Sequence, residues 1–439
     1  MTTKQTLALL RRYESRNVTH IESDGSWPIV WERAKGMQVW DAEGRKYLDL
    51  TAAFGVMAAG HANPRVVRAG QKQLAKLQHA MGDVHPHALK AELARELSRL
   101  TVERWASATR KSQLVGRKSA KTIFCSSGFE AVEAALKTAL LATGRRGVIA
   151  FEGGYHGVGY GALNATHRGH FREPFREQLS EFGHFAPFPD APADLSRVEK
   201  SLRNLLRKHR IGAVLVEPVQ ARGGIRVPPP GFLPLLRRLC NQHGALLVLD
   251  EVYTGFGRTG RWFACEYSAV VPDLICLGKA LGGGFPISAC VGRADVMDKA
   301  WPESTGEAIH TSTFLGHPVG CAMALAQLKE LRRGKLVERS AKLGGWLLSA
   351  LESEISNLKF EINVRGLGLM AGIELRHRNG FPATAEALAV VKRLLHRGFI
   401  VLPEGEHANV ISFTPPLTIT EAQLRSAVRA LADEIRQLP

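Results

Sequence analysis

The sequence lacks paired cysteine motifs and long apolar runs. Its six cysteines include no C-x-x-C pair, and most stand in apolar surroundings. This pattern favours a reduced, intracellular protein over a secreted disulfide scaffold. No stretch approaches the length of a membrane span, and the N-terminal segment lacks an apolar signal core. We therefore expect a cytoplasmic protein with no membrane partner.

Features of nucleic-acid-binding and metal-binding proteins are also scarce. A net charge of +17 favours an anionic partner. The basic residues are scattered, however, with no basic arm and no zinc-finger spacing. The segment HAMGDVHPH (79–87) offers three histidines and Asp83 but no second set of ligands. We therefore predict neither nucleic-acid binding nor a metal site.

The order of apolar runs predicts the fold class. The chain has 439 residues, of which 45% are hydrophobic, and this length indicates two or three packed units. From about residue 90, apolar runs alternate with helical patterns such as 129–142 and 232–243. Strands that are apolar throughout and joined by helices are typical of a mainly parallel sheet covered on both faces. The runs are TIFCS (122–126), GVIAF (147–151), AVLVEP (213–218), ALLVLD (245–250), LICLG (274–278) and ISACVG (287–292).

A second, smaller α+β unit is predicted after about residue 320. Residues 360–375 indicate a hairpin, and a helix near 383–397, two short strands and a last helix follow. That last helix opens with a capping box of Thr420 and Gln423. Residues 37–50 predict another hairpin. We expect an α/β protein with three parts: an N-terminal segment (1–60) that packs with the small domain, a large domain (61–324) and the small domain (325–439).

The segment GKALGGGFP (278–286) contains a lysine with unusual neighbours. Lys279 follows an apolar strand and precedes three glycines. A lysine that bonds an aldehyde carbon needs close backbone approach and a neutral amine, which desolvation favours. From these residues alone, a surface lysine in a flexible loop has equal weight.

Two other motifs place polar groups where strands end. In ALLVLDE (245–251), Asp250 ends a buried strand, where open α/β sheets bind ligands. By itself, a helix cap or a metal ligand would explain Asp250 better. In CSSGFEAVEAALKTAL (125–140), the N–H groups of Ser127, Gly128 and Phe129 would cradle a phosphate at a helix start. Ordinary N-capping is compatible with that interpretation.

Taken in order, these three motifs resemble those of class-III (ω-type) aminotransferases of pyridoxal-phosphate fold type I. The resemblance runs from about residue 27 to 437. It implies the fold type I architecture with pyridoxal 5′-phosphate (PLP) as cofactor, and ping-pong transfer of an amino group between an amine or amino acid and a keto or aldehyde acceptor. Further matching segments are WDAEGRKYLDL, GHANPRVV, FEGGYHG, VEPVQ, DEVYTGFGRTG, TSTFLGHPVG, RGLGLMAGIEL and PPLTIT.

The resemblance assigns the main cofactor contacts. Lys279 would hold PLP covalently and act as general base, and Asp250 would keep the pyridine nitrogen protonated. Tyr155 would stack on the pyridine ring, beside His156. Val252 would pack against the other face of the ring.

Three further residues complete the implied cofactor site. Glu217 would lie near the site. Tyr253 stands where many members have a glutamine that contacts the phenolic oxygen of PLP. Thr313 matches a threonine that reaches the phosphate from the partner subunit. The resemblance therefore implies a homodimer with shared active sites.

Departures from the family pattern concern the substrate. Many members grip the carboxylate of glutamate with an arginine that pairs with a glutamate; Ser412 and Arg222 occupy these two positions. Arg222 either provides the carboxylate fork itself or faces solvent or a backbone carbonyl, with equal weight. Val158 replaces an arginine of ornithine-type members. Phe54 aligns with a pocket-lining aromatic, and core packing is its alternative.

Because Ser412 replaces the arginine that binds glutamate, reactions other than transamination stay open. Class-III racemases, aminomutases and decarboxylating enzymes need no glutamate half-reaction. An alternative from another class is a nucleic-acid-binding protein with a disused PLP fold, but the retained Lys279, Asp250 and phosphate loop argue against it. We therefore predict a transaminase that acts on small-molecule amines and carbonyl compounds.

Overall fold

The computed structural model describes residues 1–105, 119–355 and 359–438. Its larger part is built on a seven-stranded sheet in the order β4-β10-β9-β8-β7-β5-β6. Strands β6, β5, β7, β8 and β9 run parallel, whereas β10 is antiparallel to both of its neighbours. The prediction of a mainly parallel sheet is confirmed, and all six predicted runs are strands. The strands are β4 (Ala120–Cys125), β5 (Gly147–Phe151), β6 (Gly183–Ala186), β7 (Ile211–Val216), β8 (Leu246–Asp250), β9 (Leu274–Leu277) and β10 (Ser288–Arg293).

Both faces of this sheet are covered. In β5, Val148 and Ala150 pack in one core with α6 and α11, whereas Ile149 and Phe151 enter a second core with α9 and α10. Successive side chains of a strand point to opposite faces, so strands that are apolar throughout bury both. The predicted helices 129–142 and 232–243 correspond to α6 and α10. The helices of this part are α3 (Pro64–Lys76), α4 (Ala88–Ser98), α6 (Gly128–Thr143), α7 (Tyr160–Leu163), α8 (Gly169–Arg172), α9 (Leu195–Lys208), α10 (Phe232–His243), α11 (Ala294–Ala300) and α12 (Pro318–Arg333).

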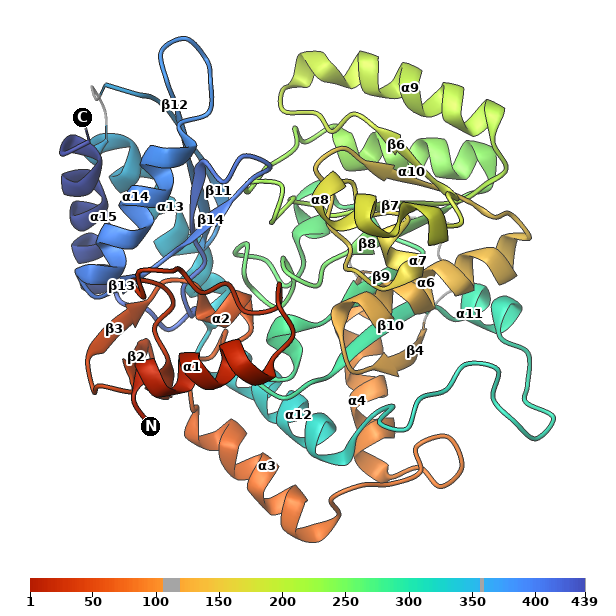
Figure 1. The fold of residues 1–439 in the computed structure, drawn as a ribbon. Helices are drawn as coiled ribbons and strands as arrows, with labels where there is room; N and C mark the ends of the chain where they lie inside the picture. Colours follow the sequence, from red (N-terminus) through yellow and green to blue (C-terminus); the bar gives the residue numbers. More distant parts are fainter. Residues whose placement is uncertain (106–118, 356–358, 439) are drawn as a thin grey trace.

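The smaller part joins the two ends of the chain. An antiparallel sheet, β11-β12-β15-β14, packs with α13 and α14, which in turn pack with α15. A third sheet pairs the N-terminal strands with β13, which runs parallel to β3. Figure 1 shows the red N-terminal strands beside the blue C-terminal elements. The elements are α1 (Thr3–Tyr13), β1 (Trp31–Lys35), β2 (Gln38–Asp41), β3 (Lys46–Asp49), α2 (Ala52–Gly55), α13 (Leu336–Glu354), β11 (Glu361–Leu367), β12 (Met370–Arg376), α14 (Thr384–His396), β13 (Phe399–Ile400), β14 (Leu402–Glu404), β15 (Val410–Phe413) and α15 (Glu421–Arg436).

Local predictions for this part are largely confirmed. The hairpins over 37–50 and 360–375 are β2–β3 and β11–β12. The capping box of α15 is present, because the Gln423 N–H donates to Thr420 Oγ1 at 3.3 Å and the Thr420 N–H donates to Gln423 Oε1 at 3.0 Å. Three short strands replace the two expected near the C-terminus. The domain boundaries stay predictions. The predicted boundary at residue 324 falls inside α12 (Pro318–Arg333).

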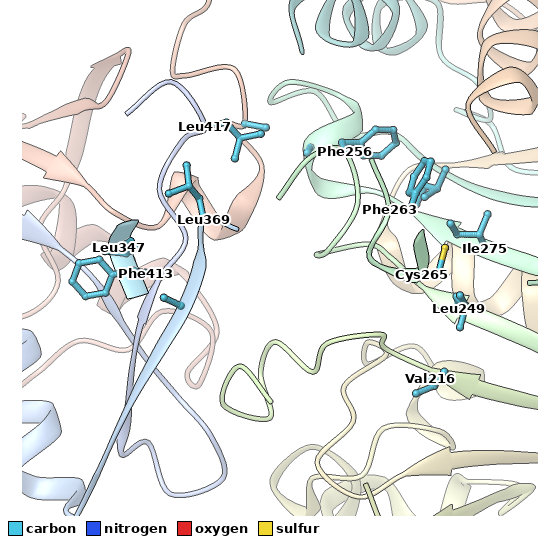
Figure 2. Packing of buried hydrophobic residues seen from close by; sticks show 14 of the residues in the cluster. Val216, Leu249, Phe256, Phe263, Cys265, Ile275, Leu347, Leu369, Phe413 and Leu417 are labelled. Atoms are coloured by element: carbon cyan, nitrogen blue, oxygen red, sulfur yellow. The ribbon is translucent and has the colours of Figure 1, made fainter. Parts of the chain in front are cut away.

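One apolar core connects the two parts. It includes residues of the large sheet and of β15, α13 and the loops between them. Figure 2 shows Val216, Leu249 and Ile275 on the side of the large sheet, and Leu347 and Phe413 on the other side. The ends of β7, β8 and β9 are therefore held close to the smaller part. Within the described ranges, none of the helices has the length and apolar character that a membrane span requires.

Candidate active site

A cavity of about 250 Å³ opens where three parallel strands end. Glu217 follows β7, Asp250 ends β8 and Lys279 follows β9, and all three line the cavity. The carboxyl ends of parallel strands are where open α/β sheets bind ligands. The fold thus brings together charged residues that are far apart in the sequence. Of the other predicted cofactor contacts, Gly128, Phe129, Tyr155, His156, Val252 and Tyr253 also line the cavity.

Lys279 is held in an uncommon backbone conformation. It begins a 3-10 turn, η6 (Lys279–Leu281), with a φ of +31°, which side-chain-bearing residues rarely adopt. Its Nζ lies 4.4 Å from the centre of the Tyr253 ring. Burial lowers the pKa of Lys279, while the charges of Asp250 and Glu217 raise it. A lowered pKa increases the share of neutral amine, which is the nucleophilic form.

Asp250 is fixed by a histidine. Its Oδ2 lies 2.8 Å from Nδ1 of His156, and its Oδ1 accepts the N–H of Val252 at 3.1 Å. Because an ionised carboxylate only accepts hydrogen bonds, His156 donates through Nδ1 in this pair. The backbone N–H of His156 donates in turn to Thr166 Oγ1 at 2.9 Å. Asp250 and His156 are both buried, so the carboxylate keeps one direction toward the cavity.

Glu217 holds the backbone that carries Tyr155. Its two carboxyl oxygens accept the N–H groups of Tyr155 at 3.0 Å and Ala221 at 3.1 Å. Burial raises the pKa of Glu217 to about 7, with His156 lowering it and Asp250 raising it. A carboxyl group that titrates near neutral pH is uncommon and is typical of functional sites.

The raised pKa of Glu217 predicts a pH-dependent stability of the cofactor-free protein. The folded state retains a proton that the unfolded chain releases near pH 4.5, so this contribution is complete below about pH 4.5 and is lost as the pH rises to about 7. The loss amounts to about 3 kcal/mol. Urea unfolding at about pH 5 and about pH 8 should show a smaller difference for Glu217→Gln than for the wild type. The exposed Glu352→Gln is the control; equal pH dependence in all three proteins would refute this account.

The start of α6 has the features of a phosphate site. The Oγ of Ser127 is buried and has no hydrogen-bond partner among the described residues. The Ser127 N–H donates to Glu130 Oε2 at 2.9 Å, which fixes the turn. The Ser127 hydroxyl and the N–H groups of Gly128 and Phe129 therefore remain for binding an anion. A Cβ on Gly128 would lie 2.9 Å from Cγ1 of Val252, so the backbone there needs glycine. The residues present therefore fit the phosphate of PLP.

Two ionisable side chains beside the cavity, Arg222 and Glu404, each have a buried polar atom without a hydrogen-bond partner among the described residues. The guanidinium carbon of Arg222 lies 5.3 Å from the centre of the Tyr155 ring, and its Nε is buried without a hydrogen-bond partner among the described residues. Oε2 of the buried Glu404, at the end of β14, also has none. Burial raises the pKa of Glu404, and the charges of Arg222 and Lys279 lower it. Arg222 is a candidate from the sequence, whereas Glu404 is not, because one glutamate in LPEGE (402–406) carries no recognisable signal.

Four candidates do not line the cavity as it is formed by the described part of this chain: Ser127, just before α6, and Thr313, Phe54 and Ser412. Thr313 is exposed in a turn, and Phe54 in α2 is 52% exposed. Ser412 is buried in β15, where its hydroxyl donates to the carbonyl oxygen of Leu402 at 3.1 Å. The substrate roles of Phe54 and Ser412 stay predictions.

The sequence matches the class-III aminotransferase family over residues 21–435. The chain belongs to that family. It is 39% identical over 422 residues to the 5-aminovalerate aminotransferase of Pseudomonas aeruginosa, covering 92% of this chain and 93% of the relative. It is 38% identical over 420 residues to the acetylornithine aminotransferase of Methanopyrus kandleri, covering 95% of this chain and 97% of the relative. A PLP-bound amine transaminase from an uncultivated Pseudomonas species has a TM-score of 0.84 and 28% identity, covering 97% of this chain and 98% of that one.

This class-III aminotransferase is a PLP-dependent enzyme with the type I fold, as the sequence predicts. Its relatives carry the names of transaminases, which favours amino transfer over racemisation, mutation of the amino position or decarboxylation.

Proposed function

We propose that this aminotransferase takes its amino group from an ω-amino acid, with a primary amine at one end of an aliphatic chain and a carboxylate at the other. The observation that carries this proposal is Arg222, a cation beside the cavity whose buried Nε has no partner among the described residues. Arginine binds carboxylates through two parallel hydrogen bonds. The substrate named for the P. aeruginosa relative, 5-aminovalerate, has both end groups.

In this proposal Lys279 moves the proton. PLP, when bound, withdraws electrons from the substrate carbon that bears the amine. The amine of Lys279, with its lowered pKa, removes the proton from that carbon and delivers it again within the same half-reaction. Asp250 supplies the negative charge that keeps the ring nitrogen of PLP protonated. His156 is a positioning residue that fixes the direction of the Asp250 carboxylate.

Other residues hold the cofactor. We assign the phosphate to the Ser127 hydroxyl and the N–H groups of Gly128 and Phe129. The walls on the two faces of the ring are Tyr155 and Val252.

Tyr253 is assigned to the phenolic oxygen of PLP. Burial raises the pKa of Tyr253 to about 12, so its hydroxyl stays neutral and can donate a hydrogen bond. That hydroxyl lies 3.2 Å from Oγ1 of Thr414. This contact fixes the Tyr253 ring in its position against Nζ of Lys279. A neutral donor at this position would take over the contact that a glutamine makes in many members of the family.

Replacement of Arg222 by methionine tests the donor assignment. Loss of a bidentate, charge-assisted contact should weaken the apparent affinity for 5-aminovalerate about 10-fold or more. Pentylamine has the same chain and amine but no carboxylate, so its half-reaction should change little. Both are followed by the absorbance of bound PLP without an acceptor. Equal changes for the two amines, or none, would remove Arg222 from the substrate site.

We further propose a homodimer in which the partner completes each site. Thr313 is exposed and lies outside the cavity of its own chain. Both features are expected of a residue that contacts the cofactor phosphate in the partner subunit. Phe54, Ile309 and Phe314 are large apolar side chains that are more than half exposed, which favours burial against another surface. Light scattering should give twice the mass of one chain, and Thr313→Ala should lose PLP faster on dialysis. An active single chain would contradict this proposal.

We place the enzyme in the cytoplasm. All six cysteines are free and buried in the structure, and unpaired buried thiols are typical of proteins from reducing compartments.

A further inference from the structure

Arg258 is a buried cation without an ion-pair partner among the described residues. It lies in DEVYTGFGRTG (250–260), the segment that begins at the end of β8, and is 2% exposed. Its Nη1 donates to the carbonyl oxygens of Leu369 at 3.0 Å and of Pro415, whereas its Nη2 is buried without a hydrogen-bond partner in the described ranges. Burial lowers the pKa of Arg258 to about 10, so the group stays charged at neutral pH. A buried charge that no counter-ion balances costs free energy and calls for a physical reason.

The Arg258 side chain connects this segment with the smaller part of the protein. Leu369 lies in the turn between β11 and β12, and Pro415 follows β15. The contact is reciprocal, because the carbonyl oxygen of Arg258 accepts the N–H of Leu369 at 3.1 Å and the hydroxyl of Ser340 at 2.9 Å. Since all of these partners are neutral, they fix the guanidinium group without balancing its charge.

Tyr253 is anchored on the same stretch of the smaller part. Its hydroxyl lies 3.2 Å from Oγ1 of Thr414, which immediately precedes Pro415. Burial raises the pKa of Tyr253 to about 12, whereas the charge of Arg258 lowers it, so the two side chains are within electrostatic reach of each other. The Tyr253 ring also lies against Lys279, whose Nζ is 4.4 Å from the centre of the ring. Arg258 and Lys279 thus both lie close to one tyrosine.

The carboxylate of Asp49 raises the pKa of Arg258 but does not pair with it. Oδ1 of Asp49 accepts the N–H of Thr51 at 2.8 Å, and Oδ2 lies 2.7 Å from Nε2 of His61. Both oxygens are therefore engaged by other groups. Arg258 thus adds a positive charge near Tyr253 that no ion pair within the described ranges cancels. Besides burial, the charges that act on Lys279 are those of Asp250, Glu217, Glu404 and Arg222.

We propose that Arg258 is a positioning residue that holds Tyr253 at the phenolic oxygen of PLP and keeps an unbalanced positive charge near it. A nearby cation favours the anionic form of that oxygen and disfavours a proton on the nitrogen that joins PLP to Lys279. Arg258 therefore lowers the pH at which this nitrogen loses its proton. The inference rests on the proposed contact between Tyr253 and PLP.

A pH titration of the visible absorbance of the PLP-loaded protein, without any substrate, tests this inference. The absorbance of bound PLP changes as the linking nitrogen loses its proton, which gives a midpoint pH. Arg258→Gln keeps a donor for one carbonyl oxygen but removes the charge, so the midpoint should rise by about 0.5 unit or more. Arg258→Lys keeps the charge and should leave the midpoint within about 0.2 unit of the wild type.

Two control variants separate the effect of charge from the effect of packing. Ser340→Ala removes a hydrogen bond to the Arg258 carbonyl oxygen without changing any charge. Arg261→Met removes an exposed arginine nearby in the sequence, which lies over the Tyr267 ring at 5.4 Å. Neither should move the midpoint by more than about 0.2 unit. Circular dichroism and the amount of bound PLP show whether each variant is folded and loaded.

Tyr253→Phe distinguishes this inference from the proposal on which it rests. It should raise the midpoint, and Arg258→Gln added to it should have a smaller effect than in the wild type. A wild-type midpoint in Arg258→Gln beside a raised one in Tyr253→Phe would overturn the inference and leave the Tyr253 assignment standing. An unchanged midpoint in Tyr253→Phe would refute that assignment, and the inference with it.

Arg258→Lys provides the decision if Arg258→Gln does not fold. A folded lysine variant with the midpoint of the wild type supports the role of the charge. A shift of about 0.5 unit or more in that variant would show that the shape of the guanidinium group matters rather than its charge, and would overturn the inference.

Discussion

Replacement of Lys279 by alanine is expected to lower kcat by about 10⁴-fold or more, because one amine both bonds the cofactor and moves the proton. The visible absorbance of bound PLP should change in the same variant. The measurement is turnover of 5-aminovalerate with 2-oxoglutarate, together with a spectrum of the purified protein. Lys299→Ala, which alters an exposed lysine of α11, should behave like the wild type.

Chemical rescue separates loss of the base from loss of the fold. Methylamine added to Lys279→Ala supplies an amine that is small enough to enter the space that the side chain leaves. It should restore part of the activity in proportion to its neutral form, so the restored rate should rise with pH. A variant that keeps near-normal activity without added amine would show that Lys279 is not the catalytic lysine.

The second large effect is expected at Asp250. Asp250→Asn keeps the shape of the side chain and removes its charge, which should lower kcat by about 10²- to 10³-fold. The Michaelis constant for the amine should change much less, because Asp250 acts on the cofactor in this account. Circular dichroism should match the wild type, since the side chain keeps its size.

His156 provides the comparison for Asp250. His156→Phe removes the hydrogen bond to Asp250 but leaves the carboxylate in place. Its effect on kcat should therefore be smaller than that of Asp250→Asn, as a positioning residue requires. An Asp250→Asn variant within about 10-fold of the wild type, or a larger effect of His156→Phe, would contradict the assignment of charge to Asp250.

The sequence predicts the centre of the site through the resemblance of its motifs to the family, since the local patterns of Lys279 and Asp250 alone leave other roles open. Glu217, Asp250 and Lys279 each end or follow an apolar run, and the sheet places these three runs on neighbouring strands. The Ala-rich helix after Ser127 and Gly128 likewise follows from local composition. In each case the residue and its position come from one continuous segment.

Features that depend on tertiary contacts were not predicted. His156 and Asp250 lie 94 positions apart, and no spacing rule relates them. Glu404 lies close enough for the charge of Arg222 to lower its pKa, although the two residues are 182 positions apart in the sequence. The antiparallel direction of β10 was also missed, since an apolar run carries no direction.

Small elements at the sheet edges were missed for a related reason. β6 (Gly183–Ala186) has the sequence GHFA, which lacks the apolar run of its neighbours. β13 pairs with β3 through only Phe399 and Ile400, and the partner lies near the other end of the chain. Such strands are stabilised by the neighbours they pair with rather than by their own composition.

The most direct measurement is the visible spectrum of the PLP-loaded enzyme during addition of 5-aminovalerate, first without an acceptor and then with 2-oxoglutarate. The account predicts that the amine removes the visible band that depends on Lys279, and that the keto acid restores it. If no amine among 5-aminovalerate, glutamate, alanine and diamines removes the band from a protein that binds PLP through Lys279, the aminotransferase mechanism proposed for these residues is contradicted.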